Sequence, residues 1–214
     1  MKTKQSGFTL VEIAIVLVII GLLLGGILKG QEMIIQAKVK NSISDFSGIS
    51  AAYFGYQDRY RAIPGDDAGA GRWTTPTAAS PGDGNRILVG LYKPALPADE
   101  TALWWDHLRR SGFVTGTGVT NPQNSFAGTI GVEQGDGAAT PGAVLGGFSN
   151  LLMCSTNLPD KVAIALDVQM DDGNPASGAV RGQEVSGDPA TIATTAATGF
   201  VETGTTVYTL CRQF

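Results

Sequence analysis

Few side chains of the kinds that carry out catalysis occur in this chain of 214 residues. There is one histidine, His107, there are two cysteines, Cys154 and Cys211, and no CxxC, HExxH or P-loop pattern is present. His107 falls on the apolar face of a short helix that the sequence predicts between Asp99 and Gly112, where a histidine more often packs than reacts. We therefore expect that the protein is not an enzyme.

Clustered aspartates offer a second kind of chemistry. Asp167, Asp171 and Asp172 lie within a span of six residues. Oxygen ligands at this density suit a hard cation such as calcium, but the spacing differs from an EF-hand loop and the terminal Glu of that loop is missing. The alternative is a turn between strands, capped by Asp and Gly. Asp66 and Asp67 would add ligands only if the fold brings them near.

Glu12 is the most informative carboxylate, because it lies inside an apolar stretch. Residues 8–28 contain no other charged side chain. A helix of this length crosses a hydrocarbon core about 30 Å thick. A carboxylate in such a segment costs about 2.5–3.5 kcal/mol on insertion scales, which indicates a function with a partner. The alternative is that Glu12 snorkels to the membrane edge.

A short leader precedes the apolar stretch. Residues 1–7 contain Lys2 and Lys4, and positive charge at this place predicts a leader in the cytoplasm and a remaining chain outside it. A secretory signal peptide has a shorter apolar run, followed by a small-residue cleavage site. Here the run is longer and continues as a helical pattern, so we expect the helix to be retained. A simple membrane anchor would leave Glu12 unexplained.

The residues at the end of the leader, Gly7-Phe8-Thr9-Leu10-Val11-Glu12, resemble the processing motif of type IV pilins and type II secretion pseudopilins. The shared features are a basic leader, Gly before the cleavage position, Phe after it, Glu at the fifth mature position and an apolar helix. The resemblance covers about the first 30 residues. It implies that a prepilin peptidase cleaves after Gly7 and N-methylates Phe8, and that copies of the chain assemble through the retained helix into a filament.

Cleavage after Gly7 would also give Glu12 a partner, because it creates an α-amino group on Phe8. In a packed filament, Glu12 of one copy would pair with the Phe8 amine of a neighbouring copy. This pairing neutralises a charge that is costly in an apolar core. We expect the pair to set the axial register of assembly.

The helical pattern continues beyond the membrane segment. From Ile34 to Tyr60, apolar residues recur at spacings of three and four, which indicates one face of an amphipathic helix. All ten prolines lie at or after Pro64, where the pattern ends. A helix over residues 8–61 would be roughly 80 Å long. We expect its apolar face, including the tyrosines, to pack in the core of the head.

Composition divides the chain at the same place. Residues 1–61 carry seven Lys or Arg against four Asp or Glu, whereas residues 62–214 carry eight against fifteen. We expect a cleaved leader at residues 1–7, an N-terminal helix at 8–61 with its transmembrane part at 8–28, and a globular head at 62–214.

The head is expected to contain an antiparallel sheet. Strands are predicted at residues 125–132, 161–168 and 205–211, and a short helical turn at 151–154. Residues 135–147 and 188–206 are predicted to form long surface loops or small strands. A long helix followed by antiparallel strands indicates the α+β class. This agrees with the pilin fold that the N-terminal motif implies.

Cys154 and Cys211 form a pair in a head that we expect outside the cytoplasm, where disulfides form. A bond between them would tie the last strand to the sheet and contribute up to about 4 kcal/mol in the chain-entropy model. A redox-active pair has little support, because the cysteines are far apart in sequence. In pilins a C-terminal disulfide often bounds a variable surface loop, and this pair resembles that arrangement. Some pseudopilins bind calcium in the head; no other cofactor is expected.

These features predict a structural subunit of a type IV pilus-like filament. The alternatives are a pseudopilin of a type II secretion system and a minor or tip pilin in adhesion or DNA uptake. The implied partners are copies of the chain, the prepilin peptidase, an inner-membrane assembly platform and, before assembly, the membrane. The net charge of −4 argues against nucleic acid as a partner. The precursor is expected in the bacterial inner membrane with its head in the periplasm, and the mature protein in a pilus or pseudopilus.

Overall fold

The structure is a computed structural model that describes residue 7 and residues 9–75, 78–135 and 144–214. Internal contacts divide the chain into two units, Met1–Lys38 and Val39–Phe214. Helix α1 (Leu10–Tyr60) begins in the first unit and ends in the second. Each unit is described by itself.

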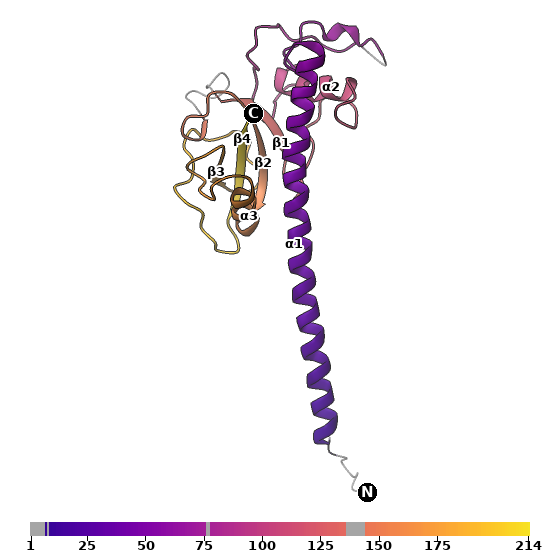
Figure 1. Cartoon of the computed structure of the whole chain (residues 1–214), viewed down its shortest axis with the longest axis vertical. Helices are drawn as coiled ribbons and strands as arrows, with labels where there is room; N and C mark the ends of the chain where they lie inside the picture. Colours follow the sequence, from indigo (N-terminus) through magenta and orange to yellow (C-terminus); the bar gives the residue numbers. More distant parts are fainter. Residues whose placement is uncertain (1–6, 8, 76–77, 136–143) are drawn as a thin grey trace. The chain divides into compact units, whose positions relative to one another are not determined.

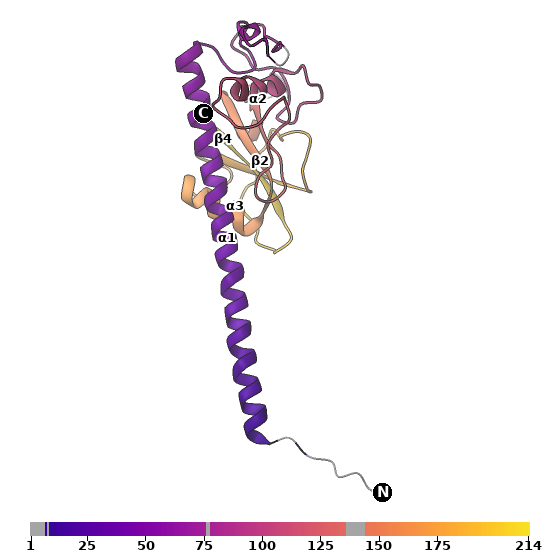
Figure 2. The ribbon, with the colours of Figure 1, turned by 90° about the vertical axis from the view of Figure 1, so that its right-hand side faces the viewer.

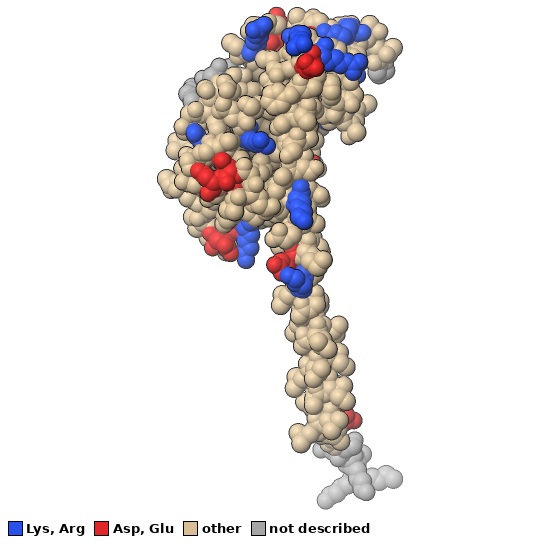
Figure 3. All heavy atoms as spheres, viewed as in Figure 1, with Lys and Arg blue, Asp and Glu red and all other residues tan. Residues whose placement is uncertain are grey.

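In the first unit, α1 is helical from Leu10 onward and its side chains are exposed. Leu10, Leu22 and Leu28 have 91%, 73% and 67% of their surface exposed. Space-filling spheres show neutral residues over most of this part of α1 (Figure 3). Helix α1 is long and apolar enough to cross a membrane.

The second unit contains a four-stranded antiparallel sheet in the order β1-β2-β4-β3 (Figure 1). The strands are β1 (Ile130–Gln134), β2 (Leu151–Pro159), β3 (Val180–Val185) and β4 (Val207–Gln213). Two further helices, α2 (Glu100–Arg110) and α3 (Asp160–Met170), and two 3-10 turns, η1 (Ala70–Arg72) and η2 (Val144–Gly146), complete the elements. The predicted α+β class is confirmed.

The C-terminal part of α1 packs on one face of this sheet, with α2 near its end (Figures 1 and 2). The core between them is rich in aromatic side chains, and each fully buried large apolar side chain contributes about 1.5–3 kcal/mol. Its members include Phe46, Tyr53 and Tyr56 of α1, Trp104 and Trp105 of α2, and Val132 and Met153 of the sheet. The predicted apolar stripe of α1 is confirmed from Val39 to Tyr56, whereas Ile34 at its start is exposed.

The opposite face of the sheet is covered by loops. Leu152 alternates with Met153 along β2 and packs with Tyr92, Val144 and Phe148 instead of α1. A third cluster joins α3, the ends of β2 and β4 and Val39 of α1. The sheet is thus buried on both faces.

Two predicted elements were wrong. Residues 161–168, predicted as a strand, belong to α3, whose buried residues Val162, Ala163 and Leu166 follow helical spacing. Residues 151–154, predicted as a helical turn, begin β2. The first six residues of β2 are all buried, so the alternation that marks a half-buried strand is missing there.

The other predicted elements agree in part or in full. The strand at 205–211 corresponds to β4 and the strand at 125–132 only to the first part of β1. The segment at 188–206 forms a loop as expected, while residues 136–143 of the other predicted loop lie outside the described residues. Asp99 precedes α2 as predicted, but its carboxylate accepts the backbone N–H of Leu96 rather than one of the helix.

Candidate functional site

Gly7 and Thr9 are the described residues next to the predicted cleavage position, and Phe8 lies outside the described residues. Gly7 is exposed, and nothing lies within 4 Å of the place where a Cβ would be. A backbone without side-chain obstruction is what a protease requires at a cleavage position.

Glu12 forms a capping box with Thr9 at the start of α1. Its Oε2 accepts hydrogen bonds from the Thr9 backbone N–H and hydroxyl, both at 2.8 Å, while its own N–H donates to Thr9 Oγ1 at 3.3 Å. This reciprocal arrangement satisfies backbone donors at the helix N-terminus. Among the described residues, Oε1 has no hydrogen bond. Sequence reasoning missed Thr9, although the pattern Thr-x-x-Glu could have identified the capping box.

The three aspartates predicted as calcium ligands are brought together. Asp167 lies in α3, Asp171 and Asp172 follow it, and one carboxylate oxygen from each lies within 4.8 Å of the others. Asp171 accepts the backbone N–H of Val180 at 2.9 Å, and Asp172 accepts the Ser177 hydroxyl at 2.6 Å. The carboxylates are therefore clustered, and the segment that contains Asp171 and Asp172 joins α3 to β3, not two strands as the sequence predicted.

Asp167 differs from the other two members because it is fully buried. Neither of its carboxylate oxygens has a hydrogen-bond partner in the described part of the chain. Burial, followed by the charges of Asp172 and Asp171, raises its pKa to about 7, while the backbone N–H of Gly173 acts in the opposite direction. A buried carboxylate without a partner is costly unless a proton or a cation neutralises it.

Asp66 and Asp67 occupy other places. The Asp66 carboxylate groups with Asp83 and Glu100 and accepts the backbone N–H groups of residues 84, 85 and 86. Asp67 forms an ion pair with Arg72 at 2.7 Å. Both carboxylates hold loops of the head in place, and they are not grouped with Asp167 as extra ligands. Asp83 and Glu100 were not singled out from the sequence, because only the fold brings them to Asp66.

His107 is a buried packing residue, as predicted. Its Nδ1 accepts the backbone N–H of Gly65 at 2.9 Å, and its Nε2 lies 2.8 Å from the carbonyl oxygen of Ser80, to which it must donate. Both ring nitrogens are therefore occupied by the backbone. Burial lowers the pKa of His107, which favours this neutral form.

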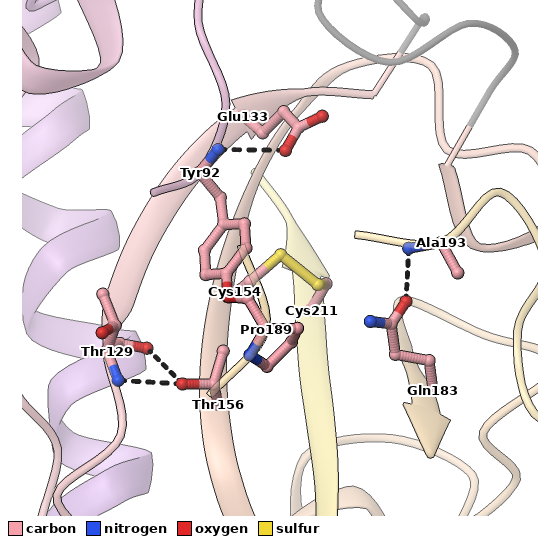
Figure 4. Close-up of a disulfide and its surroundings, with 9 residues drawn as sticks. All are labelled: Tyr92, Thr129, Glu133, Cys154, Thr156, Gln183, Pro189, Ala193 and Cys211. Carbon is pink, nitrogen blue, oxygen red and sulfur yellow. Dashed lines mark hydrogen bonds between the residues drawn. A yellow bond between two sulfur atoms is a disulfide. The ribbon is translucent and has the colours of Figure 1, made fainter. Parts of the chain in front are cut away.

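The predicted disulfide joins Cys154 and Cys211, which face each other in register on β2 and β4. Both cysteines are fully buried, and Tyr92 lies beside them (Figure 4). The Tyr92 hydroxyl donates to the carbonyl oxygen of Pro189, which fixes part of the loop between β3 and β4 over the bond. The disulfide thus ties the last strand to the centre of the sheet.

Comparison with protein families matches residues 2–28 to the prokaryotic N-terminal methylation motif. This motif is the signature of type IV pilins and pseudopilins. The N-terminal segment therefore carries the signature motif of that class, and the chain has the α+β fold of a long α1 with an antiparallel sheet. Searches of curated proteins and of solved structures gave no match to the chain.

Proposed function

We propose that this protein is a structural subunit of a type IV pilus-like filament, assembled through α1 after a prepilin peptidase removes residues 1–7. The observation that carries the proposal is the exposed apolar part of α1, directly behind a processing motif. The precursor would lie in the inner membrane with its head in the periplasm. An inner-membrane assembly platform would then transfer the helix from lipid into the filament.

The exposed side chains of α1 support a transfer of this helix from the membrane into a filament. Large apolar residues such as Val16, Ile20 and Leu24 have about half or more of their surface exposed. Burial of each such side chain is favourable by about 1.5–3 kcal/mol, so this segment requires lipid or other helices around it. Neighbouring copies can supply the same apolar surroundings along a filament core.

Glu12 supports a defined register between copies. The capping box with Thr9 occupies Oε2 and positions the carboxylate, while Oε1 remains able to accept a hydrogen bond. After cleavage, the Phe8 amine of a neighbouring copy would donate to it. The pair would cancel two charges that are costly in an apolar filament core.

The mass of the mature protein tests the processing step. The full chain is expressed with and without a prepilin peptidase. Only when the peptidase is present should the protein lose the mass of residues 1–7 and gain the mass of one methyl group. A Gly7→Val variant, which places a branched side chain at the cleavage position, should remain unprocessed. Identical masses with and without the peptidase would contradict the proposal.

The fraction in which the protein is found separates the two kinds of filament. Abundant recovery from sheared cells supports a pilus subunit. Retention in the envelope supports a type II secretion pseudopilin or a minor pilin instead. In either case the role is structural, without a catalytic set, and no nucleic-acid partner is expected.

We propose a second function for the head, binding of calcium by Asp167, Asp171 and Asp172. The observation that favours it is the buried Asp167 carboxylate, whose two oxygens have no partner among the described residues. Calcium prefers carboxylate and other oxygen ligands, so the donor set fits. Calcium should raise the unfolding temperature of the mature protein, and Asp167→Asn should abolish this effect. An equal response in both proteins would contradict the assignment.

A further inference from the structure

A polar pocket of about 360 Å³ lies in the second unit, between α1 and residues 123–125. Every residue that lines it is polar: Asn41, Ser44 and Asp45 from α1, and Gln123, Asn124 and Ser125 from the loop. A pocket lined by polar residues alone is not part of the apolar core. Its chemistry is that of a site for a charged or hydrogen-bonding group.

Asn124 makes the loop wall of the pocket rigid. Its Nδ2 donates to Ser155 Oγ at 2.8 Å and to the Thr156 carbonyl oxygen at 2.7 Å. Its Oδ1 accepts the backbone N–H groups of Phe126 and Gly128. The hydrogen-bonding capacity of Asn124 is therefore used to position the loop, and ligand binding falls to the other side chains.

Asp45 is the charged group of the pocket. It is half-buried, and it has no hydrogen bond or ion pair within the described ranges of the chain. Burial raises its pKa, and no cation offsets this cost. Asn41, Ser44 and Gln123 line the same pocket, and each has a side-chain oxygen that can accept a hydrogen bond. One carboxylate with several neutral oxygens suits an ammonium group, which has three donors and no acceptor.

Lys40 is the described lysine left without an interaction. Lys29, Lys93 and Lys161 form ion pairs with Glu32, Asp188 and Glu202, and Lys38 also has a partner. Lys40 is exposed. It cannot reach Asp45 of its own helix, because residues five apart lie about 140° apart around a helix axis.

Lys40 can reach Asp45 of a neighbouring copy. A shift of five residues along α1, about 7.5 Å, brings Lys40 of one copy level with Asp45 of the next. Pairing of Glu12 with the Phe8 amine of a neighbour requires a shift of four residues in the same direction along the chain. The flexible lysine side chain covers the difference.

We propose that the Asp45 pocket receives the Lys40 ammonium group of a neighbouring copy of this chain. The inference rests on the proposed filament function and assigns one contact within it. The two members of the contact come from different faces of α1, so the interface is head-to-tail. Such an interface propagates into an open filament rather than a closed dimer.

Cysteine cross-linking between two full-length copies tests the contact. One copy carries Lys40→Cys and a differently tagged copy carries Asp45→Cys, and the cells are oxidised mildly. A disulfide-linked dimer with both tags is expected. The matched control pairs Lys40→Cys with Asp58→Cys, an exposed position 13 residues beyond Asp45 on the same helix. A tagged dimer no stronger than in this control would overturn the proposal.

Charge reversal provides the second measurement. Asp45→Lys and Lys40→Asp should each lower the amount of assembled protein about tenfold, and the double variant should restore it. A double variant no better than either single variant would contradict the contact. Filaments of the wild type without cross-linking would contradict this inference alone, whereas absence of both filaments and cross-links would contradict the proposed function as well.

Discussion

Replacement of Asp167 by Asn is expected to stabilise the cation-free protein at pH 8. Its pKa is about 7 in the folded protein against an ordinary value of 3.8. An acid whose pKa is raised by folding lowers the free energy of unfolding when the pH is above that pKa. This destabilisation decreases as the pH falls from 7 towards 3.8, where the carboxyl group is protonated in both states. A shift of about three pKa units corresponds to about 4 kcal/mol, so with partial solvent relaxation we expect a gain of about 2–4 kcal/mol.

Calcium should offset most or all of this difference between the two proteins. At a concentration of 100 times its Kd, calcium stabilises the wild type by about 2.7 kcal/mol, and the variant, which lacks the buried charge, should gain much less. Urea unfolding of the mature protein, followed by tryptophan fluorescence, measures both effects in chelator and in calcium at pH 8. Asp83→Asn, in the other acidic cluster, serves as the control and should not change the calcium response.

Two results would refute this reasoning. An Asp167→Asn variant that is less stable than the wild type in chelator at pH 8 would show that a partner satisfies the Asp167 carboxylate. A wild type that calcium does not stabilise would contradict the metal site, whatever the effect of pH. The difference between wild type and variant should also shrink as pH falls to 4, which isolates Asp167 from other titrating groups.

Three further predictions concern the stability of the head. Removal of the disulfide by Cys154→Ser with Cys211→Ser should lower the free energy of unfolding by about 4 kcal/mol, measured by urea unfolding; a change below 1 kcal/mol would contradict the cross-link's role. The contribution of His107 to stability should fall as pH drops below about 6.5, because burial lowers the pKa of His107; the difference in stability between the wild type and His107→Gln should therefore change with pH in this range, and a constant difference would count against it. Gly131→Ala should lower the free energy of unfolding by about 1–3 kcal/mol, measured by thermal unfolding, because the added Cβ would lie 1.9 Å from the Tyr92 carbonyl oxygen. Unchanged stability would mean that the loop containing Tyr92 moves away at no cost and would contradict this prediction.

The N-terminal features could be predicted from the sequence because their signals are local. The apolar run, Glu12 and the flanking Gly7 lie within one short segment, and the stripe of α1 repeats over many turns. A long periodic pattern is a strong indication of a helix. The role of Thr9 is equally local, because the pattern Thr-x-x-Glu at the start of an apolar run indicates a capping box.

The head was harder to predict because tertiary burial decides its elements. Residues 161–168 contain Val and Ile, which favour strands, yet their burial on one side makes them helix α3. The start of β2 is buried on both faces, so periodicity could not identify it. The order of the strands places β4 between β2 and β3, an arrangement that local propensities do not specify.

The candidate sites also combine features that are visible in the sequence with features that depend on the fold. The three clustered aspartates were visible in the sequence, since they lie close together along it. That Asp167 is buried without a partner depends on how α3 packs, which the sequence does not reveal. The pocket around Asp45 depends on a loop some 80 residues further along the chain, so only the fold could reveal it.

Recovery of assembled protein from sheared cells, compared between wild type and Glu12→Ala, tests the central claim most directly. The account predicts that the wild type is recovered as filaments, whereas Glu12→Ala is cleaved and present in the membrane but absent from the sheared fraction. Glu32→Ala, which removes an exposed carboxylate paired with Lys29 of the same helix, is the matched control and should assemble. Normal filaments from Glu12→Ala would contradict the proposal that this charge directs assembly.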